Sequence, residues 1–195
     1  MFLTHKPTEA ELSEFLVLQS RLNVGYAGYG MTSFGKNHAQ AGYRKHFVQT
    51  TLGFGQRIFD AACDQMKSWR HFSLNWILLF PSQPTFAPDT TLVVCANHFV
   101  LWSMNACRIV YTVDDSTKEK RRFGYAYGTL PDHVEQGEES FIIEWNKLTN
   151  AVTYQILAYS KPNHLLVSMF WPAAVLIQDH FREQSLAAFR DQVTD

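Results

Sequence analysis

Six short segments of this sequence, all between residues 76 and 160, alternate between apolar and polar residues. Alternation with a period of two is typical of a half-buried β-strand. The segments are residues 76–79, 91–97, 106–113, 122–129, 140–146 and 152–160. Their connections are too short for the crossovers that parallel pairing needs, so the sequence predicts a mostly antiparallel sheet.

The chain begins with a predicted helix and a glycine-rich segment. Thr8 and Glu11 form a capping-box pattern, and apolar residues from Leu12 to Leu22 follow at helical spacing. From Gly25 to Gly42 there are five glycines in eighteen residues. Because glycine lets backbones approach closely, this segment is predicted to be a loop that wraps the domain or lines an opening. A plain surface loop is an equal alternative.

Two more helices are predicted around the strands. Residues 46–52 alternate as a strand, and Gly53-Phe54-Gly55 then turns the chain into a second amphipathic helix. Near the C-terminus, Pro172 occupies the position of a first helical residue, and residues 173–192 have the pattern of an amphipathic helix. Residues 165–171 fit either a strand end or a lead-in to that helix.

This order of elements predicts an α+β fold in which a curved antiparallel sheet, open or barrel-like, packs on the long C-terminal helix. The layout is similar to the START-like, or helix-grip, superfold. No linker rich in Gly, Ser or Pro divides the 195 residues, so a single domain is predicted. Residues 1–44 would form the N-terminal helix and Gly-rich loop, and residues 45–195 the helix-grip-like core.

Composition excludes several classes of protein. Lys plus Arg number 17 and Asp plus Glu 18, so the basic excess of a dedicated nucleic-acid binder is missing. No apolar run approaches the roughly 20 residues that span a membrane, and the N-terminus lacks a signal-peptide pattern. Three cysteines, Cys63, Cys95 and Cys107, cannot close a disulfide framework. A cytoplasmic location follows as the simplest expectation, with no nucleic-acid or membrane partner.

One stretch carries a resemblance. Its residues are Asn105-Ala106-Cys107-Arg108-Ile109-Val110-Tyr111, then Phe123-Gly124-Tyr125-Ala126-Tyr127-Gly128-Thr129-Leu130-Pro131, then His133, Glu135 and Gly137-Glu138-Glu139. This pattern resembles domain-of-unknown-function family 1990, a widely distributed uncharacterised family of plant and bacterial proteins, over roughly residues 45–190. Asp132 and Val134 stand where the family pattern has Gly and Pro. The resemblance implies a shared fold but brings no established activity.

The predicted strand 122–129 has two unequal faces. Phe123, Tyr125 and Tyr127 alternate onto one face, and the glycines and alanine between them leave the other almost bare. A bare face invites close packing of another element or of a ligand. The strand therefore either borders a binding cavity or makes a tight contact with its tyrosines in the core.

Arg108 is a second ambiguous residue. Simple alternation places Arg108 and Tyr111 on opposite faces of their strand. An arginine in an apolar strand must be paired or reach solvent. It would bind a carboxylate or phosphate of a ligand, or pair internally with Glu138, Glu139 or Glu144.

The sequence around residues 131–139 is rich in titratable groups. Since Glu138 and Glu139 are consecutive at the start of a strand, one of them must point inward, where it needs a partner or a raised pKa. His133 and Glu135 do not have a known metal-ligand spacing, and no nucleotide-binding or nucleophile motif occurs. We therefore predict neither a metal nor a cofactor.

The aromatic content suggests a function. The chain has 15 Phe, 8 Tyr and 5 Trp but only 18% charged residues, which suits an apolar pocket with a few polar groups. We predict a small-molecule-binding protein whose cavity lies between the sheet and the C-terminal helix and takes a small apolar or aromatic ligand. The candidate lining residues are Trp76, Trp102, Arg108, Tyr111, Tyr125, Tyr127, His133, Glu138, Glu139, Tyr154 and Phe181.

Two alternatives stay open. A cavity enzyme of the cyclase, isomerase or dehydratase type would use Glu138, Glu139 or His133 as its proton carrier, with a tyrosine as hydrogen-bond donor. A non-catalytic interaction protein would use its aromatic residues to fill the core. An inward cluster of carboxylate, Tyr and Arg would favour the enzyme, an apolar cavity without one would favour carriage, and a filled interior would favour the interaction protein. The oligomeric state is left open.

Overall fold

The computed structural model describes residues 1–33, 41–99, 101–163 and 171–194. Its strands are β1 (Phe2–Leu3), β2 (Arg44–Phe54), β3 (Ile77–Phe80), β4 (Thr91–His98), β5 (Leu101–Ser116), β6 (Lys120–Thr129), β7 (Glu135–Asn146) and β8 (Ala151–Pro162). Its helices are α1 (Glu9–Ser20), α2 (Gln56–Lys67), the short 3-10 helix η1 (Arg70–Phe72) and α4 (Trp171–Thr194). The predicted elements are therefore present, and the strands are mostly longer than their sequence patterns. The ambiguous stretch before α4 lies outside the described residues except for Trp171.

The strands form one antiparallel sheet in the order β2-β8-β7-β6-β5-β4-β3, and β1 pairs with β5. Each connection from β3 to β8 joins neighbours in the sheet, as short turns require. Within the described residues, β2 and β3 occupy the two edges and do not pair with each other. The sheet is therefore open, and the barrel-like alternative is wrong.

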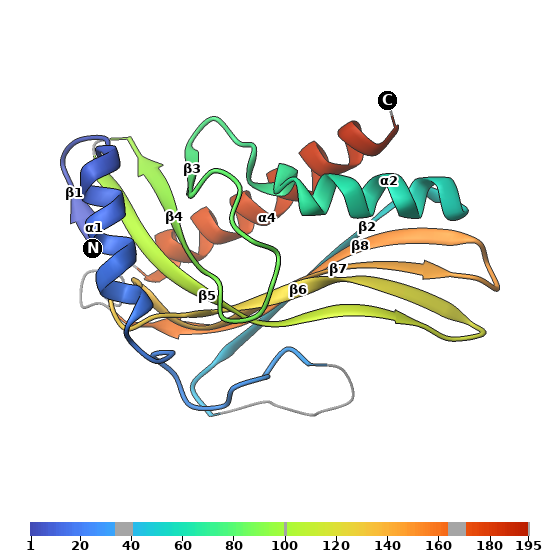
Figure 1. The fold of residues 1–195 in the computed structure, drawn as a ribbon, viewed down its shortest axis with the longest axis horizontal. Coiled ribbons are helices and arrows are strands. Elements are labelled where there is room, and N and C mark those ends of the chain that lie inside the picture. Colours follow the sequence, from blue (N-terminus) through green and yellow to red (C-terminus); the bar gives the residue numbers. More distant parts are fainter. Residues whose placement is uncertain (34–40, 100, 164–170, 195) are drawn as a thin grey trace.

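The sheet curves around the C-terminal helix (Figure 1). Helices α2 and α4 lie across one side of it, which we call the inner face, and the segment that follows α1 runs along the other, the outer face. Large aromatic side chains on the inner face are fully buried, among them Tyr125, Phe141 and Tyr154, which pack with Phe59 of α2 and Phe189 of α4. Burying each such side chain contributes roughly 1.5–3 kcal/mol. This α+β arrangement is the helix-grip layout expected from the element order.

Helix α1 covers part of the outer face. Its predicted capping box is present, because the Thr8 side chain accepts from the Glu11 backbone N–H and the Glu11 carboxylate accepts from the Thr8 N–H. Leu12 and Phe15 pack in a second buried cluster with Met104 and other residues of β4 and β5. The sheet thus has apolar surface on both faces, whereas the sequence pattern predicts a cover only for the face that packs on the C-terminal helix.

The glycine-rich segment wraps the domain, at least over residues 25–33; residues 34–40 lie outside the described chain. The Gly25 N–H donates to the Thr129 carbonyl at 2.9 Å. Tyr26 lies so close to Gly128 that a Cβ there would stand 2.3 Å from the tyrosine Oη. The bare face of β6 is therefore packed by this segment, and the tyrosine face of β6 turns toward the core.

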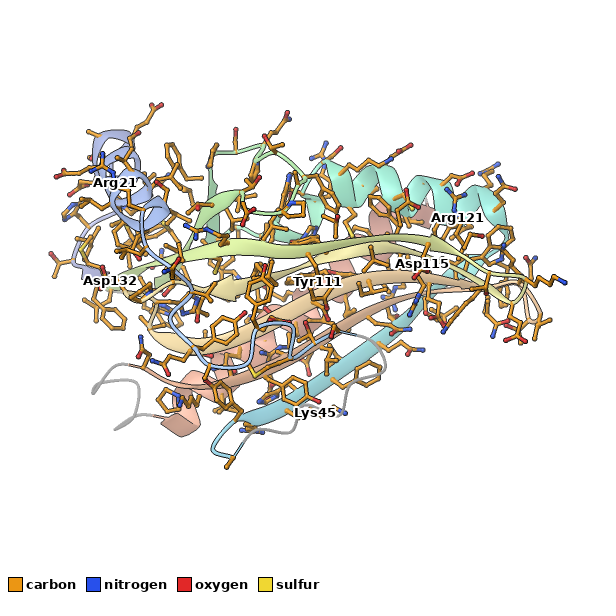
Figure 2. All side chains as sticks on the ribbon, turned by 60° about the horizontal axis from the view of Figure 1, so that its bottom comes forward. Arg21, Lys45, Tyr111, Asp115, Arg121 and Asp132 are labelled. Carbon is orange, nitrogen blue, oxygen red and sulfur yellow. The ribbon has the colours of Figure 1, made fainter. Side chains whose placement is uncertain are left out.

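A bulge in β5 changes which residues share a face. The register of β5 with β6 shifts between Ile109 and Tyr111, so Val110 is the additional residue. Arg108 and Tyr111 therefore both point to the outer face, and their expected placement on opposite faces is wrong. The Val110 carbonyl accepts a hydrogen bond from Tyr29 Oη at 2.7 Å, which ties the N-terminal segment to the bulge. Tyr111 is seen beside that segment in Figure 2.

Across the described residues, none of the helices combines the length and the apolar character needed to cross a membrane.

Candidate functional site: a cavity with one polar end

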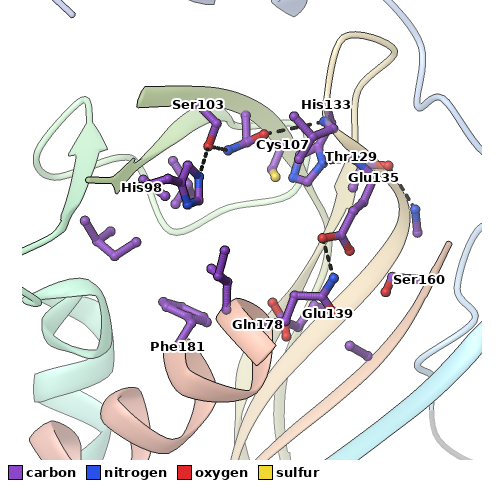
Figure 3. Close-up of a pocket in the computed structure, with 18 of the residues that line it drawn as sticks. His98, Ser103, Cys107, Thr129, His133, Glu135, Glu139, Ser160, Gln178 and Phe181 are labelled. Atoms are coloured by element: carbon purple, nitrogen blue, oxygen red, sulfur yellow. Dashed lines mark hydrogen bonds between the residues drawn. The ribbon is translucent and has the colours of Figure 1, made fainter. Parts of the chain in front are cut away.

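A cavity of about 650 Å³ opens on the inner face between the sheet and the first half of α4 (Figure 3). This volume is in the usual range for small-molecule pockets. Its apolar walls come from β1, from β3 and the residue before it, and from β4, β5, β8 and α4. They include Phe2, Leu3, Trp76, Ile77, Val94, Ala96, Leu101, Ala158, Ile177 and Phe181. Polar side chains gather where β7 and β8 meet α4, and they include His133, Glu135, Glu139, Ser160, Gln178 and Arg182.

The periodicities of strand and helix produce this polar end. Glu135 and Glu139 are four residues apart in β7, so both point to the inner face. Gln178 and Arg182 are four residues apart in α4, so they share one helical face with Phe181 between them. Because α4 crosses the inner face, these two rows of side chains meet at the cavity.

The centre of the polar end is a buried ion pair. Arg182 Nε lies 2.9 Å from Glu139 Oε1, and their side chains are 5% and 11% exposed. Tyr127 donates its hydroxyl to Glu139 Oε2 at 2.7 Å, so both carboxylate oxygens have partners. Burial is the main cause that raises the Tyr127 pKa well above its ordinary value, which keeps this hydroxyl protonated as a donor. This is an inward cluster of carboxylate, Tyr and Arg.

The ion pair continues to the edge of the sheet. Arg182 Nη1 also lies 3.3 Å from Asp179, whose carboxylate is 3.2 Å from His46 Nδ1 on β2. Desolvation and the nearby Arg182 guanidinium lower the His46 pKa. A neutral His46 suits a donor role toward Asp179. Arg182 is thus paired with two protein carboxylates, Glu139 of β7 and Asp179 of its own helix.

Glu135 is the cavity carboxylate that titrates near neutral pH. Gln178 donates its side-chain amide to Glu135 Oε1. Burial raises the pKa of Glu135 to about 7, and the nearby Ser160 hydroxyl and Arg182 charge oppose that shift only in part. Glu135 therefore exists in both its protonated and its ionised form around pH 7.

His133 is neutral at the same pH. Its Nδ1 accepts the backbone N–H of Glu135 at 2.9 Å, and burial lowers its pKa to about 3. A neutral imidazole that accepts at Nδ1 carries its proton on Nε2. We assign this tautomer from the hydrogen bond.

Six of the eleven candidate residues border the cavity, although the carboxylate of one of them, Glu138, points away from it; they are Trp76, Tyr127, His133, Glu138, Glu139 and Phe181. Trp76 closes one side, where its indole N–H donates to Gln184 of α4 at 2.6 Å and its ring lies against Phe181. Direct contact of these residues with a ligand stays a prediction.

The two remaining inner-face tyrosines lie deeper under the helices, outside the cavity. Tyr125 Oη is 2.5 Å from His71 Nε2 of η1, and Tyr154 Oη is 3.5 Å from Ser185 Oγ of α4. Burial lowers the His71 pKa to about 3, so the imidazole is neutral among aromatic rings. These residues belong to the packed core.

The other three candidates are on the outer face. Trp102 pairs with Leu3 of β1 and packs beside the α1 cluster. Tyr111 Oη is 2.8 Å from Thr32 Oγ1. Arg108 donates to the Ser20 carbonyl at 2.7 Å, and among the described residues it has no ion pair. Its predicted pairing with Glu138, Glu139 or Glu144 is therefore wrong, because the backbone end of α1 provides the acceptor instead.

The paired glutamates point to opposite faces. The carboxylate of Glu138 turns to the outer face, where it accepts from Tyr26 Oη at 2.7 Å, the Gly30 N–H at 2.8 Å, and the N–H of Thr32 at 2.9 Å. The Thr32 hydroxyl provides a fourth hydrogen bond. Of the two residues, Glu139 is the one that points inward, and Arg182 is the partner that an inward glutamate needs.

Sequence reasoning missed Glu135 as an inward carboxylate and missed Gln178, Ser160 and Arg182 altogether. Arg182 had a detectable signal, because it follows Phe181 on the side of the C-terminal helix that carries apolar residues. A search for the cation that an inward glutamate needs would have found it. In the chain as described, no group of three or more His, Cys, Asp or Glu side chains converges as metal ligands do.

A solved structure from Thermus thermophilus shares this fold. It has a TM-score of 0.51 and 9% identity with this chain, and the match covers 77% of this chain and 97% of the other. At this identity the likeness concerns the fold alone.

Sequence relatives are more informative about the family. A UPF0548 protein of Dictyostelium discoideum is 29% identical over 195 residues, covering 93% of this chain and 90% of that protein. A UPF0548 protein of Arabidopsis thaliana is 31% identical over 150 residues, covering 75% and 72%. The model of the family described as Domain of unknown function (DUF1990) matches residues 25–188. The resemblance found in the sequence is thus confirmed, and the chain belongs to the DUF1990 family.

Proposed function

We propose that the protein binds a small, mostly apolar molecule in the cavity on its inner face. The observation that carries this proposal is a cavity of about 650 Å³ with largely apolar walls, in which the charged side chains gather at one end. Such a combination is typical of small-molecule sites, where apolar walls provide affinity and a few polar groups fix orientation. The open cavity also speaks against an interaction protein with a filled interior. The three described cysteines are free and buried, which supports a cytoplasmic location.

Native mass spectrometry of protein purified without added ligand tests this proposal. We expect a reproducible extra mass that is lost when the same sample is denatured. The extra mass should be one small molecule per chain, and its fragmentation should reveal a predominantly hydrocarbon or aromatic compound. A clean apo mass combined with no uptake of added apolar probes would contradict the proposal.

A cavity-filling variant locates the molecule. Ala96 lies on the inner face of β4 and lines the cavity, so Ala96→Phe should fill part of it and abolish the extra mass. Ala10 is exposed on α1, and Ala10→Phe makes the same change away from the cavity. We expect the control variant to retain the molecule. Circular dichroism on both variants separates lost binding from lost folding.

A second candidate function is proton transfer on the bound molecule, as in an isomerase or dehydratase. Two observations favour it: the pKa of Glu135 is about 7, and Glu139, Tyr127 and Arg182 form a charged cluster beside it. A general acid or base works best with a pKa near the working pH. Glu135 fits this role better than His133, whose pKa is about 3, or Glu138, whose carboxylate faces away.

Solvent deuterium distinguishes binding from proton transfer. The co-purified molecule should gain carbon-bound deuterium when the protein is incubated in D₂O, and Glu135→Gln should stop that exchange while retaining the molecule. A molecule recovered from the wild-type protein without deuterium would assign the cavity to binding alone.

A further inference from the structure

The polar end of the cavity contains polar atoms whose hydrogen bonds the described residues do not satisfy in standard geometry. Ser160 is only 7% exposed, lines the cavity, and its hydroxyl has no hydrogen bond of standard geometry among the described residues. The side-chain oxygen of Gln178 is in the same situation, because its amide N–H₂ is used by Glu135. A buried polar atom without a partner costs roughly 1–3 kcal/mol, so such atoms mark the place of a missing polar group.

The unsatisfied atoms are mainly acceptors. The Gln178 oxygen can only accept, the Ser160 hydroxyl can do both, and Glu135 accepts whenever it is ionised. His133, with its proton on Nε2, is the neutral donor of this region. A group that donates one hydrogen bond and also accepts one fits this set of partners.

A carboxylate or phosphate does not fit. The arginine of the cavity wall, Arg182, is already paired with Glu139 and Asp179. An anionic group would meet Glu135 and Glu139 in a buried environment where the described residues provide no free cation, so repulsion is weakly screened. The two histidines that line the cavity, His98 and His133, have lowered pKa values because of burial and bring no positive charge at pH 7.

We propose that the cavity selects apolar molecules that end in an uncharged hydroxyl group, placed between Glu135, Gln178 and Ser160, and that it rejects the corresponding carboxylates. This inference rests on the proposed binding function and specifies the ligand class. The hydroxyl donates to the Gln178 oxygen or to Glu135 and accepts from Ser160, while the hydrocarbon part lies against the walls formed by Trp76, Phe181 and their neighbours.

Calorimetric titration with 1-decanol and with decanoate tests this selectivity at pH 7.5, because the two probes share a chain and differ in the end group. We expect 1-decanol to bind about tenfold more tightly, the factor that corresponds to about 1.4 kcal/mol. Glu135→Gln removes the negative charge and should reduce this ratio about threefold or more by admitting decanoate. Glu144→Gln makes the same substitution in β7 beside Lys120, outside the cavity, and should leave the ratio unchanged.

A second variant covers the case in which Glu135→Gln does not fold. Ser160→Ala removes a hydroxyl that makes no hydrogen bond of standard geometry, so it should weaken 1-decanol binding about threefold and reduce the preference for 1-decanol over decanoate. Decanoate binding as tightly as 1-decanol would overturn the selectivity but leave the binding function standing. If neither probe binds the wild-type protein, the inference fails, and the proposed function fails with it when the purified protein also shows a clean apo mass.

Discussion

Glu138 and Glu139 are consecutive residues of β7 and are buried to a similar degree, yet their surroundings differ. Glu139 faces the cavity and is neutralised by a single cation, Arg182, from a helix far along the chain. Glu138 faces outward and has no cation among the described residues; backbone N–H groups and hydroxyls of residues 26–32 hold it instead.

The difference shows two ways to bury a carboxylate. A loop can surround the charge with donors and close the space around it, as on the outer face. A single guanidinium leaves neighbouring volume open, as on the inner face. The outer arrangement seals the sheet, whereas the inner one stabilises a charged wall beside a cavity. Each of the following predictions changes one side of this comparison.

Removing the inner cation should have the largest effect. Arg182→Met leaves Glu139 buried without its counter-charge, which costs about 3–5 kcal/mol in the free energy of unfolding. Urea unfolding at pH 7.5 measures this loss. The double variant Glu139→Gln, Arg182→Met should recover most of it. Lys67→Met breaks an exposed pair with Asp64 and should cost within about 1 kcal/mol, so equal losses for Lys67 and Arg182 would contradict the argument.

Glu138→Gln should lower the free energy of unfolding by less than Arg182→Met, and its effect should be confined to the outer face. The amide replaces one acceptor oxygen by a donor that faces the donors of residues 30–32, and we expect a loss of about 2–3 kcal/mol. Hydrogen exchange should accelerate in residues 25–33 while the strands around the cavity stay protected. Faster exchange throughout the sheet would show that the outer face does not act as a separate unit.

Glu135, on the inner face, should make the stability of the protein depend on pH. Its pKa rises from 4.5 in the unfolded chain to about 7 in the folded protein, so between these values the folded state holds a proton that the unfolded state has lost. The free energy of unfolding therefore falls as pH rises from 4.5 to 7, and the loss is complete above 7. Glu135→Gln should remove this fall and be about 2 kcal/mol more stable than wild type at pH 8, after allowance for solvent screening in the cavity.

Because His71 and His133 have lowered pKa values, they change stability in the opposite direction below pH 6.5. The test therefore uses the difference in the free energy of unfolding between Glu135→Gln and wild type, measured by urea unfolding at each pH. A difference that does not change between pH 5 and 8 would refute the assignment of Glu135.

Gly128→Ala should have the smallest effect. Its Cβ would stand 2.3 Å from Tyr26 Oη, so the loop must shift, at a cost of about 1–2 kcal/mol. In a Tyr26→Ala background the same substitution should cost little, since the space is then free. Thermal unfolding of the four proteins gives the coupling between the two sites, and additive effects would contradict the contact.

The sequence predicted the sheet and helices well because local pattern determines them. The alternation in residues 122–129 and the capping box at Thr8 depend only on neighbouring residues. The face of Tyr111 was not predictable in this way, since the single additional residue Val110 reverses the alternation and leaves no local signal.

The site was predicted less completely than the fold because it depends on distant partners. That one of Glu138 and Glu139 points inward follows from their adjacency, but which one does depends on Arg182 and on Tyr26, far away in the chain. Burial of Glu135 likewise requires α4 to lie across β7. Tyr125 and Tyr154 were predicted to line the cavity, but their position along the sheet puts them in the core.

The pairing of β2 with β8 has a consequence for synthesis on the ribosome. Strands β4 to β8 each pair with the strand made just before them, but β2 is made early and pairs only with the last strand, through contacts such as Phe47 with Leu157. During translation β2 therefore has a free edge until nearly the whole chain has emerged. Chaperones that protect nascent chains should accordingly associate with residues 44–54 until β8 and α4 are complete.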